Sequence, residues 1–117
     1  MNIIDSIIFA SRQMFNLKVL TFDIFDILFV VSSLPNFPRD EDGEELELET
    51  YGIMELTDNK LVFYTGGEFQ KPMEIIVEVV NNVPRITGSS IISDFYNYKT
   101  KELDEDTIYN FSGLAKL

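Results

Sequence analysis

The chain contains no cysteine and no histidine. Without cysteine, disulfide bonds, thiolate metal sites and cysteine nucleophiles are excluded. Without histidine, neither a Ser-His-Asp triad nor a histidine-ligated zinc site can be built from this chain. Paired carboxylates remain as a catalytic option, but a chain of 117 residues has little room for a supporting cleft. We therefore expect no metal site, no cofactor and no enzymatic activity.

Basic residues are scarce as well. The chain has 9 Lys and Arg against 20 Asp and Glu, which gives a formal net charge of −11. A field of this sign repels phosphate backbones, so direct nucleic-acid binding is not expected. The same field attracts basic proteins and speeds their encounter, although such a charge also serves solubility alone. The composition leaves both interpretations open.

Long apolar runs are missing too. The most apolar stretch, residues 24–31, is interrupted by Asp26 and is too short to span a bilayer. The first residues also lack the basic, apolar and small-residue succession of a secretory signal. We therefore expect a cytoplasmic protein with no membrane partner. A chain of 117 residues with 45% hydrophobic residues fits one domain over 1–117.

The N-terminal part of the chain has helical spacing. Residues 2–15 predict an amphipathic helix, with Asn2 or Asp5 as N-cap. The positions that follow this spacing are Ile4, Ile7, Ile8, Ser11, Met14 and Phe15.

Two interpretations compete for residues 17–33. Thr21 can cap a helix over 22–31, in which Asp23 and Asp26 share one exposed edge. Alternatively, the β-branched and aromatic residues at 19–25 form a strand. The spacing of the two aspartates favours the helix. The apolar stretch 24–31 is also a candidate interface of a homo-oligomer.

From residue 45 onward the pattern has a period of two, which is typical of a half-exposed strand. One face holds Leu46, Leu48, Thr50, Gly52, Met54 and Leu56, and the other holds Glu45, Glu47, Glu49, Tyr51, Ile53 and Glu55. Further strands are predicted over 61–64, 73–79, 83–87 and 91–98, with turns at 58–60, 65–68, 81–82 and 88–90. The side chains expected to be buried are Leu48, Met54, Leu56, Ile75, Val77 and Val79.

These elements predict an α+β fold. It consists of an antiparallel β-meander of about five strands, with an N-terminal helical region and a short C-terminal helix. The C-terminal helix covers 104–116, with Asp104 or Asp106 as its cap. The side chains expected to face the sheet are Ile108, Phe111 and Leu114.

The stretch 40–55 carries eight acids and no base. On a strand, Glu45, Glu47 and Glu49 would project the same way about 7 Å apart, where like charges repel. A basic partner would relieve that repulsion, whereas a structural interpretation makes the charges a guard against edge aggregation. The predicted partner-binding residues are Asp40, Asp42, Glu45, Glu47 and Glu49, with Tyr51 as an aromatic anchor. An alternative aromatic surface comprises Tyr64, Phe95, Tyr96 and Tyr98.

The whole profile (small, acidic and without the usual catalytic residues) is similar to that of bacterial immunity proteins, which neutralise a toxin by covering its active site. It is also similar to that of phage-encoded inhibitors that mimic nucleic acid by charge. The resemblance is one of profile and not of motif. It implies a toxin inhibitor with a basic protein partner, which would include nucleic-acid-cleaving toxins. The alternatives are a nucleic-acid mimic and a structural or assembly subunit, and the sequence leaves the oligomeric state open.

Overall fold

The computed structural model describes residues 1–15 and 23–111. Its elements are α1 (Ile3–Phe15), α2 (Ile24–Ser32), β1 (Thr50–Leu56), β2 (Lys60–Gly67), β3 (Gln70–Val80), β4 (Val83–Ile91), α3 (Phe95–Lys99) and α4 (Glu105–Phe111). The four strands form one antiparallel sheet in the order β1-β2-β3-β4. The predicted α+β class is therefore confirmed, with four strands in the described residues and not about five.

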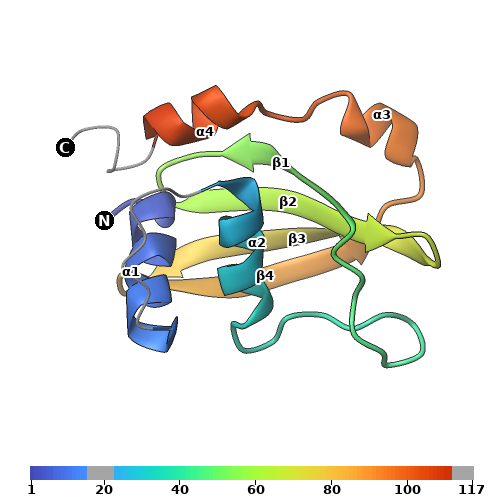
Figure 1. Cartoon of the computed structure of the whole chain (residues 1–117), viewed down its shortest axis with the longest axis horizontal. Helices are drawn as coiled ribbons and strands as arrows, with labels where there is room; N and C mark the ends of the chain where they lie inside the picture. Colours follow the sequence, from blue (N-terminus) through green and yellow to red (C-terminus); the bar gives the residue numbers. More distant parts are fainter. Residues whose placement is uncertain (16–22, 112–117) are drawn as a thin grey trace.

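The core lies between one face of the sheet and the first two helices. Figure 1 shows α1 and α2 side by side across that face, and α3 and α4 along the β1 side of the molecule. Helix α1 contacts β3 and β4, and α2 contacts β1. We call the sheet face under α1 and α2 the inner face, and the opposite one the outer face. The fully buried inner side chains include Ile3, Ile4, Ile7, Ile27, Leu28, Val30, Val31, Ile53, Leu61, Ile75 and Val77.

Both N-terminal helices begin at side-chain caps. The Asn2 Oδ1 accepts a hydrogen bond from the backbone N–H of Asp5 (2.8 Å), as predicted for α1. In α2, Asp23 and Asp26 form a reciprocal capping box, each carboxylate accepting from the other's backbone N–H. The helical interpretation of this segment is thus confirmed, but its cap is Asp23. The predicted cap Thr21 lies outside the described residues.

Helix α2 also settles the status of the apolar stretch 24–31. Its buried residues, Ile24, Ile27, Leu28, Val30 and Val31, belong to the core. Phe25 and Phe29 are about half exposed, and their rings pack against Tyr51 of β1 and Phe15 of α1, respectively. Most of this stretch is therefore not a free surface.

The sheet departs from the prediction at its C-terminal end. Residues 88–90, expected as a turn, continue β4. The second half of the expected strand 91–98 is helix α3, and only Ile91 belongs to a strand. The Asp94 carboxylate accepts from the Asn97 backbone N–H and caps this short helix. Tyr64 then packs edge-on against the rings of Phe95 (5.0 Å) and Tyr98 (6.0 Å). The aromatic residues that favoured a strand instead pack a helix onto the outer face.

The regular alternation predicted for 45–56 is also wrong. Strand β1 begins at Thr50, so Glu45, Glu47 and Glu49 precede it. Leu46 and Leu48 pack at the core, and after residue 49 the phase changes so that Tyr51 and Ile53 do so. A register irregularity between Ile53 and Glu55 then returns Leu56 to the core. The phase changes explain why one period of two could not describe the whole segment.

The predicted core is confirmed in part. Ile75 and Val77 are completely buried, whereas Leu48, Leu56 and Val79 are only half-buried and pack against the core. The prediction that Met54 belongs to the core is wrong, because this residue falls at the register irregularity and lies outside the core cluster. These positions fix the inner face that supports the site described below.

The C-terminal segment closes the β1 side. The Leu103 backbone N–H donates to the Ile53 carbonyl (2.7 Å), and Asp104 accepts from the Thr107 backbone N–H (2.7 Å), which confirms it as the α4 cap. Ile108 is buried, as predicted. The expected sheet-facing residues Phe111 and Leu114 fall outside the described side chains. Among the described helices, none is long and apolar enough to cross a membrane.

Candidate functional site

The acidic loop is ordered around the side chain of Asp40. Its Oδ1 accepts hydrogen bonds from the backbone N–H groups of Asp42 (2.9 Å) and Glu44 (2.8 Å). The Asp40 backbone also exchanges bonds with Gly43 and Glu44. Gly43 has φ +78°, a conformation that glycine adopts without steric cost. Asp40 thus holds the loop together and is half-buried, which sequence reasoning did not distinguish from a binding role.

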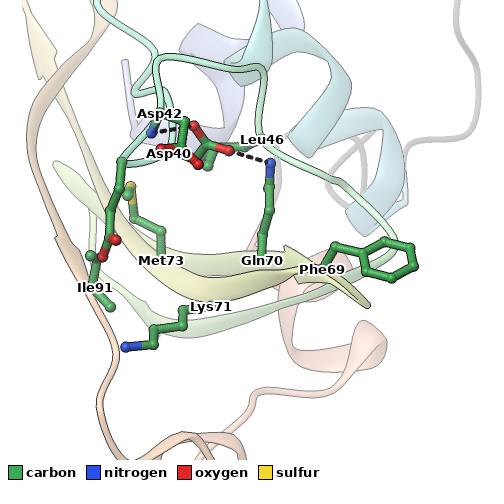
Figure 2. A pocket seen from close by; sticks show the side chains of 9 residues that line it. Asp40, Asp42, Leu46, Phe69, Gln70, Lys71, Met73 and Ile91 are labelled. Atoms are coloured by element: carbon green, nitrogen blue, oxygen red, sulfur yellow. Dashed lines mark hydrogen bonds between the residues drawn. The ribbon is translucent and has the colours of Figure 1, made fainter.

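Gln70 ties this loop to the hairpin between β2 and β3. Its Nε2 donates to the Asp40 Oδ2 (3.0 Å) and to the Glu45 carbonyl (2.8 Å), and its Oε1 accepts from the Glu47 backbone N–H. Figure 2 shows this side chain extending from the strand to the loop. One neutral amide therefore satisfies three loop groups and fixes the distance between loop and hairpin.

Glu47 makes a second connection to the same hairpin. Its Oε2 accepts from the Phe69 backbone N–H (3.4 Å), and its side chain lies over Gly67, where a Cβ would collide with the carboxylate. The Glu47 carbonyl also accepts from the buried Thr65 hydroxyl (2.9 Å). Glu47 is therefore an anchor of the fold at this end of the sheet, and not a free charge.

Loop and hairpin together enclose a pocket of about 210 Å³. Its apolar lining consists of Leu46, Met73 and Ile91, and its acidic lining of Asp40, Glu41 and Asp42. The remaining lining residues are Phe69, Gln70 and Lys71. In Figure 2 the Lys71 side chain points away from the loop, and the Phe69 ring projects from the hairpin tip. We call this the acidic-rim pocket.

Exposure separates the rim of this pocket from its supports. Glu41 and Asp42 are exposed, and no described cation lies within ion-pair distance of them. Phe69 is 84% exposed, which is unusual for a phenylalanine. The sequence pattern predicted Asp42 but missed Glu41 and Phe69. The turn expected at 65–68 is formed by Glu68 and Phe69, because Gly66 and Gly67 continue β2. Phe69 therefore lies at the tip of the hairpin, where a side chain has few neighbours to pack on.

The other predicted residues are spread along the segment. Glu45 and Glu49 are exposed, but Glu49 lies towards the β1 side and lines a different hollow. Tyr51 is half-buried and packs against Phe25 of α2, with ring centroids 5.9 Å apart. The predicted interface is thus divided: Asp40 and Asp42 line one pocket, and Tyr51 belongs to the helix-sheet contact.

A second acidic group forms where the C-terminal segment meets the rest of the chain. Glu49, Glu102, Asp104 and Glu105 line an open hollow of about 590 Å³. Burial raises the pKa of Glu105, and the negative charges of Asp23, Asp106 and Asp26 add to the rise. A hydrogen bond with the Ile24 backbone acts in the opposite direction. The hydrogen bonds from Thr107 lower the pKa of Asp104. Sequence reasoning missed this group because its members come from distant segments.

The outer face carries two buried tyrosine hydroxyls. The Tyr64 hydroxyl donates a hydrogen bond to the Glu102 Oε2 (2.7 Å). Burial raises the pKa of Tyr64, and the hydrogen bond to Glu102 and the charge of this carboxylate add to the rise. The Tyr98 hydroxyl is buried with no hydrogen-bond partner among the described residues, and burial, with the charges of Glu74 and Glu55, raises its pKa. Both phenols stay neutral at physiological pH. Of the aromatic surface predicted from sequence, Tyr96 alone is highly exposed.

In the described part of the chain, no group of three or more His, Cys, Asp or Glu side chains is arranged to hold a metal ion. The chain matches no protein-family model, and comparison with curated proteins and with solved structures yields no match.

Proposed function

We propose that this chain is a small acidic binding protein that occludes a basic protein partner, and that it acts in the cytoplasm as an immunity protein against a toxin. In this proposal it works by binding and not by catalysis. The observation that carries it is the acidic-rim pocket, in which Glu41 and Asp42 stand above an apolar lining beside the exposed Phe69.

The pocket suits a lysine or arginine side chain of the partner. Such a side chain has an apolar stem and a charged end. The stem would contact Leu46 and Met73, and the charged end would lie at the carboxylates of Glu41 and Asp42. An exposed aromatic at the rim adds contact area at low entropic cost, as aromatic anchors of interfaces do. The net charge of −11 would speed the encounter with a basic toxin.

Co-expression tests the toxin part of this proposal. The product of the adjacent open reading frame is expressed alone and together with this chain. We expect growth arrest in the first case, rescue in the second, and a complex that co-purifies. A neighbour that is harmless and forms no complex would contradict the immunity role.

Paired charge variants test the binding surface. Glu41→Gln with Asp42→Asn removes two rim charges, and Asp58→Asn with Asp106→Asn removes two exposed charges elsewhere. We expect the rim variant to associate with the partner about tenfold more slowly at low salt, with the control close to wild type. The difference should shrink at high salt, because exposed charges are screened. Equal effects of the two variants would make net charge, and not the pocket, the source of affinity.

A second candidate function is inhibition of a nucleic-acid-binding enzyme by charge mimicry. The second acidic group, at Glu49, Glu102, Asp104 and Glu105, favours it, because charge is then not confined to one loop. Competition with a labelled duplex for a panel of DNA-binding enzymes would test it. If the labelled duplex stays bound to these enzymes at micromolar concentrations of this chain, the result would argue against mimicry.

A further inference from the structure

The two edges of the sheet differ in how they are covered. Strand β1 has α3 packed against it and accepts a bond at the Ile53 carbonyl from the Leu103 N–H. Strand β4 is the other edge. An uncovered edge presents a row of N–H and C=O groups that can pair with another strand.

The register shows which β4 groups are free. The Ile92 N–H donates to the Pro72 carbonyl (2.9 Å), so Ile92 and Pro72 are a hydrogen-bonded pair. Ser90, two residues earlier in β4, stands opposite Glu74, two residues later in β3. In an antiparallel ladder the inward and outward groups alternate. The N–H and C=O groups of Ser89 and Ile91 therefore point away from β3, and no described residue forms a backbone hydrogen bond with them from outside the sheet.

The usual protection of an edge strand is confined to the first part of β4. Pro84 lacks an N–H, Arg85 carries a charge, and the register shifts opposite Ile76 and Val77. From Ile86 to Ile91 the strand has no charged residue and no proline. Val83 (46% exposed) and Ile91 (43% exposed) place apolar surface near its two ends.

Charge decides which strand fits this edge. Two copies that each carry −11 repel over most of their surfaces. The stretch 86–91 contains no carboxylate, and the charged residue closest to it within β4 is the cation Arg85. Carboxylates stand on the neighbouring β3, where Glu78 accepts a hydrogen bond from the Thr87 hydroxyl (2.6 Å) and Glu74 pairs with Ser90. They lie one strand back from the edge, so two copies can pair along β4 without a carboxylate in the contacting strands themselves. The small side chains of this stretch, Thr87, Gly88, Ser89 and Ser90, allow close pairing.

We propose that β4 pairs with β4 of a second copy of this chain. A two-fold axis makes such a pairing antiparallel and self-complementary. It would extend the sheet continuously with four strands from each copy, and both helical layers would lie on the same face. An apolar hollow of about 580 Å³ adjoins the start of β4, lined among others by Phe9, Met14 and Val83, and supplies apolar surface beside the ladder.

Sedimentation equilibrium on the full chain measures the association. We expect a dimer that grows with concentration up to about 1 mM and strengthens between about 0.05 M and about 0.5 M salt, because salt screens the repulsion between copies. This salt dependence is opposite to that expected for a basic partner, so the two proposals fail independently. A chain that stays monomeric at the highest concentration and salt overturns the pairing. Species larger than a dimer also overturn it, because one edge per copy closes the assembly.

Variants at Ser89 locate the contact. Ser89→Pro removes an outward N–H that the monomer does not use, so the fold should survive while the dimer weakens at least about tenfold. Ser89→Ala keeps the N–H and should dimerise like wild type. If the proline variant melts abnormally, Ser89→Glu against Ser89→Gln makes the same test by charge. Equal association of the variants in either pair contradicts an interface at β4.

Amide hydrogen exchange gives a readout that a change in stability would not mimic. The Ser90 N–H points towards β3 and should be protected at every concentration. The Ser89 and Ile91 N–H groups should exchange quickly in dilute protein and become protected as the concentration rises. Rapid exchange of Ser89 in a sample shown to be dimeric would place the interface elsewhere and overturn the proposal.

Discussion

Two glycines on the outer face of the sheet differ in the space above them. A Cβ on Gly52 would lie 2.5 Å from the Glu102 Cδ and 2.7 Å from the Tyr64 Cε1. A Cβ on Gly88 would meet only the Ile76 side chain, whose nearest atom, Cδ1, would lie 3.4 Å away. Gly52 is therefore required by the packing of the C-terminal segment, whereas Gly88 is not.

We expect Gly52→Ala to lower the free energy of unfolding by about 1–3 kcal/mol, because Tyr64 and Glu102 must move and their hydrogen bond is disturbed. Gly88→Ala should change it by less than about 1 kcal/mol in either direction, since the side chain fits and the unfolded chain loses entropy. Urea unfolding of the two variants measures both. A Gly52→Ala protein as stable as Gly88→Ala would show that the C-terminal segment is not packed on β1 as described.

At the scale of elements, α4 meets α2 through like charges. The Glu105 carboxylate lies near Asp23, Asp26 and Asp106, and burial with these charges raises its pKa. A carboxyl group whose pKa is raised in the folded state supports folding fully below its unfolded pKa, and this support is lost as pH rises through the folded pKa. The contact is therefore weakest at neutral and higher pH.

We expect Glu105→Gln to raise the melting temperature at neutral pH, because it removes the charge and keeps the acceptor. The gain should disappear as pH falls below the pKa of Glu105, where the wild-type side chain is also neutral. Glu68→Gln, on the exposed hairpin turn, serves as a control and should have little effect at any pH. Melting curves from acid to neutral pH measure the difference. A pH-independent gain would point to packing and not to charge.

Local pattern predicted the elements whose causes are local. Three such features depend on a few neighbouring residues each, and the structure confirms them: the alternation of Ile75 and Val77, the Asn2 cap, and the spacing of Asp23 and Asp26. The helix at 95–99 had a local signal that was missed, namely the cap at Asp94. Without it, the aromatic residues alone favoured a strand.

The site depends on contacts that no local pattern contains. Gln70 forms hydrogen bonds with loop residues that lie from 23 to 30 positions away in the sequence. These bonds fix the loop so that Glu47 supports the hairpin, whereas Asp42 stays exposed at the rim of the pocket. The second acidic group exists only after α4 has packed beside α2. Sequence reasoning could therefore predict an acidic surface here, but not which acids are free.

At the scale of the whole molecule, unbalanced charge opposes folding. The chain carries −11, and an ion pair such as Lys60 with Glu55 (3.3 Å) is exposed and contributes little. We expect the melting temperature to rise by several degrees between about 0.05 M and about 0.5 M sodium chloride, because salt screens the mutual repulsion. A variant with several exposed acids changed to amides should respond less. A melting temperature that falls with salt would show that specific ion pairs dominate.

The position of α1 and α2 before the sheet has a consequence for synthesis. These helices are made first, yet the surfaces that bury their apolar faces are β3 and β4 for α1 and β1 for α2. While the ribosome is still translating the strands, Ile4, Ile7 and Val31 have no sheet to pack on. The nascent chain therefore carries half of its future core uncovered until the residues of β4 emerge, and this interval is when a chaperone would be needed most.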